Sequence, residues 1–175
     1  MGVRSDDSCP TVTPGAPTTS RLTVVWTETD GRAAVRARSE AACELGCGRR
    51  AQSFGHRKRR AKQGTWSPTN GVDLCGDGTR GCHGLLTSYP AFARAGGWEV
   101  DSWADPETVP VYLSSREGPM WVLLQFDPDD PAGVSHLRVQ VDPDVYGLPE
   151  VPVLPWQFVE ADRAARRARA EAAAL

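Results

Sequence analysis

Four of the five cysteines stand in two close pairs whose spacing suits a metal site. Cys43 and Cys47 form a CxxxC pair, and after 27 further residues Cys75 and Cys82 form a second pair with six residues between them. Two thiolate pairs, each presented by a tight turn, can surround a zinc ion tetrahedrally. Glycines at 46, 48, 76, 78 and 81 permit the backbone conformations that such turns require. The spacing therefore predicts a structural zinc site.

The alternative is a pair of disulfides. No charged-then-apolar secretory pattern is visible at the N-terminus, so we expect a cytoplasmic protein. A reducing cytosol favours a metal over disulfides. The remaining cysteine, Cys9, stands alone in a segment rich in Pro, Ser and Thr, and we assign it to no site.

Two histidines and an asparagine lie in the same stretch. His56 stands in SFGHRKRRAKQG, Asn70 in SPTNGVDLC, and His83 directly follows Cys82. An imidazole can accept a proton near neutral pH and can also bind a cation. Each residue taken alone has a structural reading: a surface histidine in a basic run, a turn asparagine and a histidine packed on the zinc site. Their joint placement favours a functional reading.

Together these anchors resemble the HNH nuclease family, in the variety encoded by actinobacteria and their phages. The resemblance covers residues 43–98, CELGCGRRAQSFGHRKRRAKQGTWSPTNGVDLCGDGTRGCHGLLTSYPAFARAGGW, and continues weakly into DPETVPVYL and MWVLL. It rests on both cysteine pairs, His56 followed by Arg57, Asn70 five residues before Cys75, and His83 after Cys82.

The resemblance implies an α+β fold with a ββα-metal core. The first strand should hold SFGHR, the loop AKQGTWSPTN should carry Asn70, and a helix should begin near His83. The helix GLLTSYPAFARAG should break at Pro90 and end at Gly96 and Gly97.

The resemblance also implies a metal-dependent endonuclease acting on double-stranded DNA. His56 would be the general base that activates water, Asn70 would fix the loop and orient His56, and His83 would bind a catalytic Mg²⁺ or Mn²⁺. Five basic side chains would neutralise DNA phosphates in a salt-sensitive way. They are Arg57, Lys58, Arg59, Arg60 and Lys62.

One position departs from the family pattern. Better-known members have Asp or His before the base, as a second metal ligand, whereas this chain has Gly55. Asp73 or Asp77 could supply a replacement ligand. The alternative function is therefore a catalytically inactive zinc-stabilised module that binds DNA or a protein. A redox or disulfide protein is a third, weaker reading.

Charge and composition outline the remaining organisation. Residues 43–98 carry nine basic and three acidic side chains, whereas residues 99–156 carry two basic and eleven acidic ones. We expect a disordered leader at 1–20, the zinc-knuckle domain at 21–100, an acidic β extension at 101–156 and a helix at 157–175. The extension could cover the hairpin or mimic DNA. No apolar stretch is long enough to span a membrane, and the oligomeric state is open.

The sequence also predicts individual strands outside the knuckle region. LTVVWT (22–27) indicates a strand, followed by a turn at ETDGR and then a second strand or short helix. VPVYL (109–113), MWVLLQF (120–126) and LRVQV (137–141) indicate further strands, with a turn at SSREGP.

Overall fold

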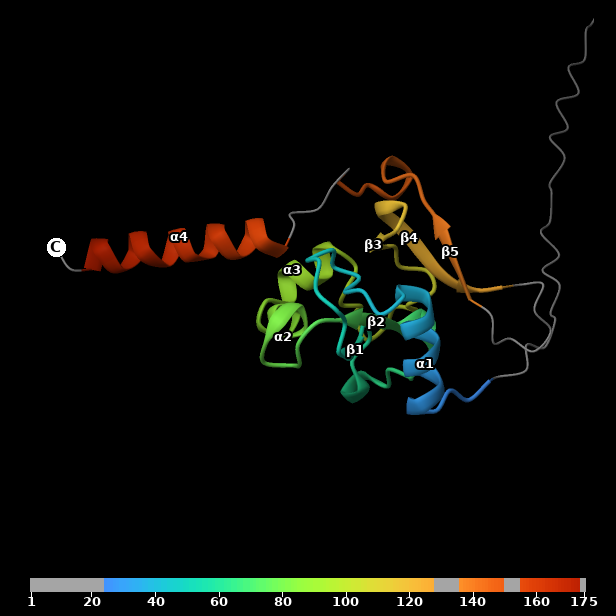
Figure 1. Ribbon diagram of the computed structural model, residues 1–175. Helices are drawn as coiled ribbons and strands as arrows, with labels where there is room; N and C mark the ends of the chain where they lie inside the picture. The colour runs from blue at the N-terminus through green and yellow to red at the C-terminus, as the bar shows by residue number, and fades with distance from the viewer. Residues whose placement is uncertain (1–23, 128–135, 150–154, 174–175) are drawn as a thin grey trace, which may run out of the picture.

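The computed structural model describes residues 24–127, 136–149 and 155–173, and it has an α+β fold with two small antiparallel sheets (Figure 1). The helices are α1 (Glu28–Ser39), α2 (Gly81–Ser88), α3 (Pro90–Ala95) and α4 (Pro155–Ala173). The strands are β1 (Ser53–His56), β2 (Gly71–Leu74), β3 (Val111–Ser115), β4 (Gly118–Phe126) and β5 (His136–Gln140). Three short 3-10 helices are η1 (Arg60–Lys62), η2 (Pro68–Asn70) and η3 (Asp144–Tyr146). None of the described helices is long and apolar enough to cross a membrane.

The first sheet is the hairpin of β1 and β2. Ser53 lies opposite Leu74, and His56 lies opposite Gly71. Every residue of β2 is buried, because α1 and α2 both pack against it. A Cβ on Gly71 would lie 2.3 Å from the ring of Phe54 and 2.8 Å from Val35 of α1, so only glycine allows this close packing. The prediction of a strand at SFGHR and of a loop carrying Asn70 is confirmed.

The strand predicted at 22–27 is not found over its described residues, 24–27, and the turn predicted at ETDGR is wrong. Residues 24–27 are irregular, and α1 already begins at Glu28. The Thr27 hydroxyl accepts a hydrogen bond from the Asp30 N–H, and the first turn carries two acidic side chains. This N-cap and the favourable interaction of acidic groups with the helix N-terminus outweigh the cost of Gly31 within the helix.

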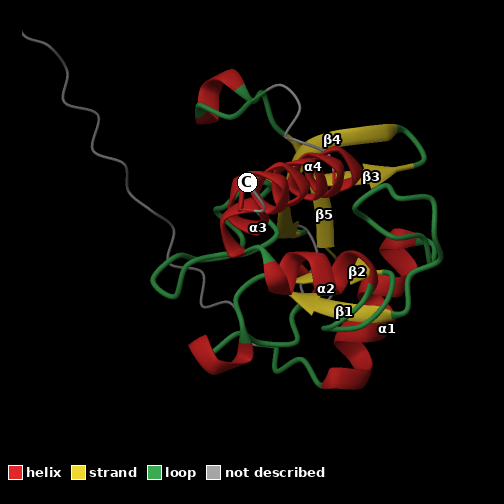
Figure 2. Cartoon of the chain, turned by 90° about the vertical axis from the view of Figure 1, so that its left-hand side faces the viewer, coloured by secondary structure: helices red, strands yellow, loops and turns green. Residues whose placement is uncertain are grey.

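Helices α2 and α3 follow the predicted break at Pro90. The chain leaves the helical conformation at Tyr89, and α3 starts with Pro90 at its first position, where a missing N–H costs nothing. Helix α3 ends before Gly96 and Gly97, as expected. Figure 2 shows α2 beside the β1–β2 hairpin.

The second sheet has the strand order β3-β4-β5 and confirms the three strands expected after residue 108. Val122 at the centre of β4 lies opposite Val111 of β3 and Gln140 of β5. The turn expected over SSREGP shrinks to Arg116 and Glu117, because Ser114 and Ser115 pair with Pro119 and Gly118.

One hydrophobic core joins the two sheets. Leu74 of the hairpin, Leu113 of β3 and Leu124 of β4 belong to the same buried cluster. The Trp98 indole N–H donates to the Tyr112 carbonyl oxygen at 2.7 Å, which fastens the segment after α3 to β3. The acidic extension is therefore packed into the same core as the knuckle region. The leader predicted at 1–20 lies outside the described residues.

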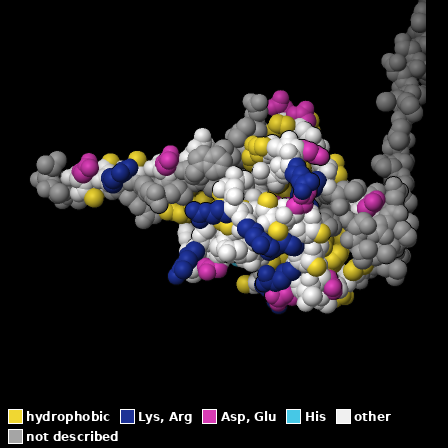
Figure 3. All heavy atoms as spheres, in the orientation of Figure 1, with side chains coloured by type: hydrophobic (Ala, Val, Ile, Leu, Met, Phe, Trp, Pro, Cys, Tyr) yellow, Lys and Arg dark blue, Asp and Glu magenta, His cyan; other side chains and the backbone are white. Residues whose placement is uncertain are grey.

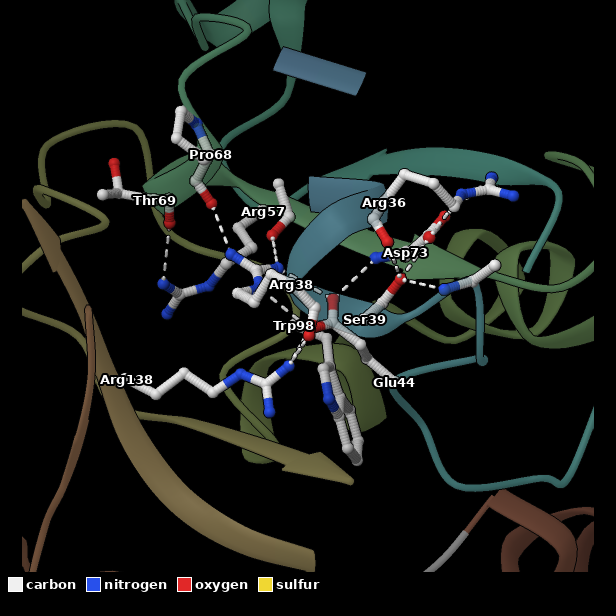
Figure 4. Close-up of polar contacts among 12 residues, drawn as sticks. Arg36, Arg38, Ser39, Glu44, Arg57, Pro68, Thr69, Asp73, Trp98 and Arg138 are labelled. Carbon is white, nitrogen blue, oxygen red and sulfur yellow. Dashed lines mark hydrogen bonds and ion pairs between the residues drawn. The ribbon is translucent and has the colours of Figure 1, made fainter. Parts of the chain in front are cut away.

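A buried network of ion pairs supports this core (Figure 4). Arg38 of α1 donates to both carboxylate oxygens of Glu44, at 2.9 and 2.8 Å, and Arg138 of β5 approaches Glu44 at 3.5 Å. Arg36 pairs with Asp73 of β2 at 2.8 Å. Because Glu44 is 1% exposed, its charge depends on these partners.

The predicted C-terminal helix is present as α4, which extends away from the body of the molecule (Figure 1). An aromatic side chain near its start packs on α3 and the residue before it. Phe158 contacts Tyr89 and Phe92, with ring centroids 4.8 and 4.6 Å apart.

Candidate metal centre and histidine pocket

The four paired cysteines come together in the structure. Cys43 and Cys47 lie in the turns after α1, Cys75 follows β2, and Cys82 lies in the first turn of α2. Their sulfur atoms all lie within 4.8 Å of one another. All four are free thiols, so the disulfide alternative is not what the structure shows. This cluster could hold a metal ion, and four sulfur ligands suit zinc.

The local backbone fits such a metal. The N–H of Cys75 donates to the Cys43 sulfur and the N–H of Cys82 donates to the Cys75 sulfur, each at 3.4 Å. Hydrogen bonds from the Cys82 side chain and from backbone N–H groups lower the pKa of Cys43 to about 5. Gly76 has a φ of 79°, and a Cβ there would lie 2.2 Å from the Arg80 carbonyl oxygen. The turn therefore requires glycine.

His83 lies on α2, next to the metal cluster and against the start of β1. Its Nδ1 is 2.9 Å from the Ser53 hydroxyl, and that hydroxyl donates to the Leu74 carbonyl oxygen at 3.3 Å. In the tautomer in which Nδ1–H of His83 donates to the Ser53 hydroxyl, Nε2 keeps a lone pair. Histidines that bind metals commonly have their other nitrogen fixed like this. Burial lowers the pKa of His83, which keeps the ring neutral.

His56 ends β1 in an aromatic setting. Its ring packs against Phe54 and Trp66, with centroids 4.8 and 4.3 Å away, and those two rings also contact each other at 5.1 Å. Its Nε2 is buried and has no hydrogen-bond partner among the described residues. Burial, then the positive charges of Arg60 and Arg32, lowers the pKa of His56 to about 4. The imidazole is therefore neutral at pH 7 and able to accept a proton.

Both histidines line one cavity of about 280 Å³. Gly55 and Leu74 contribute to its wall, and Arg59, Arg60 and Glu99 also line it. Asp73 and Asp77 do not line this cavity. Asp73 pairs with Arg36, and exposed Asp77 accepts from Thr79.

Asn70 fastens the loop that follows His56. Its side-chain oxygen accepts from the Lys58 N–H at 2.6 Å, and its amide donates to the carbonyl oxygens of Lys58 and Thr65 at 3.0 and 2.9 Å. The Arg57 N–H donates to the Asn70 carbonyl oxygen at 2.8 Å. Asn70 is 1% exposed, so these bonds are shielded from water. Asn70 is thus bonded to the backbone of the residues that follow His56.

Gly55 faces Leu74, and there is no room for a side chain there. A Cβ at position 55 would lie 2.4 Å from Leu74 Cδ1 and 3.3 Å from its Cγ. The aliphatic side chain of Leu74, which is 1% exposed, thus fills the space beside Gly55. The second metal ligand of better-known HNH sequences has no counterpart at this position.

The prediction that Arg57 contacts DNA is wrong. Arg57 is fully buried, and its guanidinium donates to the carbonyl oxygens of Gly97, Pro106 and Val109 at 2.8, 2.9 and 2.7 Å. Burial lowers its pKa to about 9, so it remains protonated at neutral pH. It holds the segment 97–109 onto the end of β1. The sequence of a basic run does not indicate which of its side chains is buried.

The other basic residues of the run have different surroundings. Lys58 is half-buried and donates to the Ala104 carbonyl oxygen at 3.2 Å. Arg59 and Arg60 are exposed at the cavity, and Lys62 is 35% exposed. The guanidinium carbon of Arg60 lies 5.2 Å from the centroid of the Trp66 ring. Figure 3 shows Lys and Arg side chains gathered over the body of the molecule.

Sequence reasoning missed Glu99 and Arg94. Glu99 is 7% exposed and lies at the cavity, where it pairs with Arg59 at 2.8 Å, Lys62 at 3.6 Å and Arg94 at 3.8 Å. Nothing in a single sequence links an acidic residue at 99 with a basic run 40 positions earlier.

No family model, curated protein or solved structure matches this chain.

Proposed function

We propose that this protein is a metal-dependent endonuclease of the HNH type that hydrolyses DNA phosphodiester bonds. The observation that carries the proposal is the order β1, loop, β2, α2, which brings His56 and His83 to one cavity while Asn70 fastens the connecting loop. This arrangement has the strand–strand–helix order of a ββα-metal core.

In the proposed reaction His56 accepts a proton from the attacking water. His56 lines the cavity and its ring is neutral at pH 7; its unpartnered Nε2 is buried, so the ring would have to turn toward the water for that role. His83 would hold Mg²⁺ or Mn²⁺ through Nε2, with water and phosphate oxygens as the remaining ligands. When bound, the cation would stabilise the negative charge that develops on the phosphate and the leaving oxygen. Arg59, Arg60 and Lys62 would bind neighbouring phosphates.

The cysteine cluster would serve a structural role with zinc. The backbone N–H of His83 donates to the Cys75 carbonyl oxygen at 3.2 Å, and His83 directly follows Cys82. A metal that fixes these cysteines would therefore fix the position of His83 on α2.

A plasmid-nicking assay tests the proposal. Purified protein is incubated with supercoiled plasmid, with added Mg²⁺ or Mn²⁺ or with no added divalent cation, and His56→Ala and His83→Ala are assayed in parallel. We expect cation-dependent relaxation that both substitutions reduce by about 100-fold or more. Equal zinc content in all three proteins serves as the control for folding. Equal nicking by His56→Ala would refute the assigned base.

A catalytically silent zinc-stabilised module that binds DNA or a protein is the second candidate. One observation favours it: Leu74 fills the space beside Gly55, so the motif supplies only His83 as a cation ligand. Salt-sensitive retention on DNA, with no nicking under either cation, would support this function and exclude the nuclease.

A further inference from the structure

Glu99 is a buried carboxylate at the centre of a group of exposed cations. Its side chain is 7% exposed, whereas those of Arg59, Lys62 and Arg94 are 45%, 35% and 46% exposed. Arg59 approaches one carboxylate oxygen, and Lys62 and Arg94 approach the other. Three cations around one carboxylate leave a net charge of +2 at the edge of the cavity that His56 and His83 line.

The cations come from two separate parts of the chain. Arg59 and Lys62 belong to the loop between β1 and β2, whereas Arg94 lies in the last turn of α3. Without a carboxylate between them, three positive charges at this spacing would repel one another and separate. Glu99 therefore sets the distance between the loop and the end of α3.

Glu99 itself is held firmly by its backbone. Its N–H donates to the Ala93 carbonyl oxygen at 3.0 Å, and the N–H of Val100 donates to the Arg57 carbonyl oxygen at 2.8 Å. The loop after β1 is thus fastened twice, by Asn70 on one side and by Glu99 on the other. Glu99 accepts one hydrogen bond from Arg59 and makes an ion pair with Arg94 at 3.8 Å, so most of the five N–H groups of each guanidinium do not bond Glu99.

We propose that Glu99 is a positioning residue that holds Arg59, Lys62 and Arg94 as a clamp for a phosphate of the DNA strand beside His56. This inference rests on the proposed interaction with DNA and adds Arg94 to it. Planar guanidinium groups suit phosphate oxygens, and the carboxylate beneath them restricts their motion before DNA binds.

Equilibrium binding of a short DNA duplex, measured over a range of salt concentrations without added divalent cation, tests the clamp. For Arg94→Gln we expect weaker DNA binding. The slope of log K against the logarithm of the salt concentration should also decrease in magnitude by about 0.9, which corresponds to one lost phosphate contact. Arg116→Gln is the matched control, because Arg116 is 83% exposed on the turn between β3 and β4. An equal slope for Arg94→Gln and Arg116→Gln would overturn the role of Arg94.

The Glu99→Gln variant separates positioning from simple charge. It removes one negative charge, so a charge effect alone would tighten DNA binding, whereas loss of positioning weakens it. We expect Glu99→Gln to bind roughly threefold more weakly or worse, with Glu99→Asp closer to the wild type. Binding by Glu99→Gln that is equal to or tighter than wild type would refute the proposal.

The nicking assay keeps the two proposals apart. Plasmid nicking with an unchanged salt slope in Arg94→Gln would leave the nuclease standing and remove the clamp. A smaller salt slope in Arg94→Gln, with no plasmid nicking by the wild type, would retain the clamp in a DNA-binding protein without nuclease activity. The Arg94→Gln arm does not depend on a buried substitution, because Arg94 is exposed.

Discussion

At the scale of single residues, side chains of the same type that are close in sequence differ in burial. Arg57 is fully buried and bound to backbone carbonyl groups, while Arg59, two positions later, is exposed beside the cavity. Strand alternation does not account for this contrast, because Arg57 already lies beyond the end of β1 and residues two positions apart would share a face. Charge counting alone treats them alike.

Replacement of Arg57 should therefore destabilise the fold. Arg57→Met would leave carbonyl groups of residues 97, 106 and 109 buried without donors, and we expect the free energy of unfolding to fall by about 3 kcal/mol or more. Urea denaturation measures this. Arg116→Met, at an exposed turn, should change it by less than about 0.5 kcal/mol. Equal midpoints for the two variants would contradict the structural role.

The lowered pKa of His56 fixes the sign of a pH effect. Its folded pKa of about 4 lies below the ordinary value of 6.5, so the unfolded chain binds the proton first as pH falls. This contribution to stability is fully present above pH 6.5 and is lost as pH falls toward 4.

We expect the unfolding midpoint of the wild type to fall more between pH 6.5 and pH 4 than that of His56→Gln. The shift of the His56 ring protons in NMR spectra reports the pKa directly. If the NMR titration gave a pKa near 6.5 for His56, the folded protein would not protect the ring from protonation.

At the scale of elements, the β1–β2 hairpin and α2 determine where the candidate groups lie. The hairpin pairs Gly55 with Val72, and the side chain of Leu74 fills the space beside Gly55. This contact explains why position 55 carries no side chain. Under the proposed function, this packing leaves position 55 without a cation ligand.

Substitutions at 55 and 74 should be coupled. Gly55→Ala alone forces Leu74 to move and should cost about 1–3 kcal/mol, and Leu74→Ala alone should cost about 2–5 kcal/mol. In the double variant the new methyl group enters the space that Leu74 leaves, so the total cost should be smaller than the sum. Additive losses in denaturation experiments would show that the two side chains do not compete for one space.

The strand at SFGHR and the loop carrying Asn70 were expected from the family resemblance, because four residues with the burial pattern of β1 give no alternating signal of their own. The helices and turns had local signals, since Pro90 interrupts a helix and glycines mark the knuckle turns. The start of α1 was missed because one N-cap at Thr27 outweighed an apolar run before it. Glu99 and Arg57 could not be placed, because Arg59, the nearest cation to Glu99, and Gly97, an acceptor for Arg57, each lie 40 residues away in sequence.

At the scale of the whole molecule, the two sheets and the cysteine cluster depend on one another. Cys43, Cys75 and Cys82 belong to the same buried cluster as Leu113 and Leu124 of the second sheet. A metal bound by the cysteines would thus connect α1, the hairpin and α2 at one edge of the core. Loss of the metal should then affect the entire fold.

We expect the purified protein to contain about one zinc ion per chain and to lose cooperative unfolding when a strong chelator removes it. Cys82→Ser should lower the zinc content and the unfolding midpoint together. Elemental analysis and circular dichroism measure the two quantities. A chelated protein that unfolds at the same midpoint as the untreated one would rule out a structural metal.

The contact between Trp66 and His56 gives the cavity its own optical signal. The two rings meet edge to face with centroids 4.3 Å apart, and the indole also lies 5.2 Å from the guanidinium carbons of Arg32 and Arg60. An imidazolium ion quenches indole fluorescence more strongly than neutral imidazole does. The difference in emission between the wild type and Trp66→Phe would therefore follow protonation of His56 and the arrival of an anion at Arg60, without any added dye.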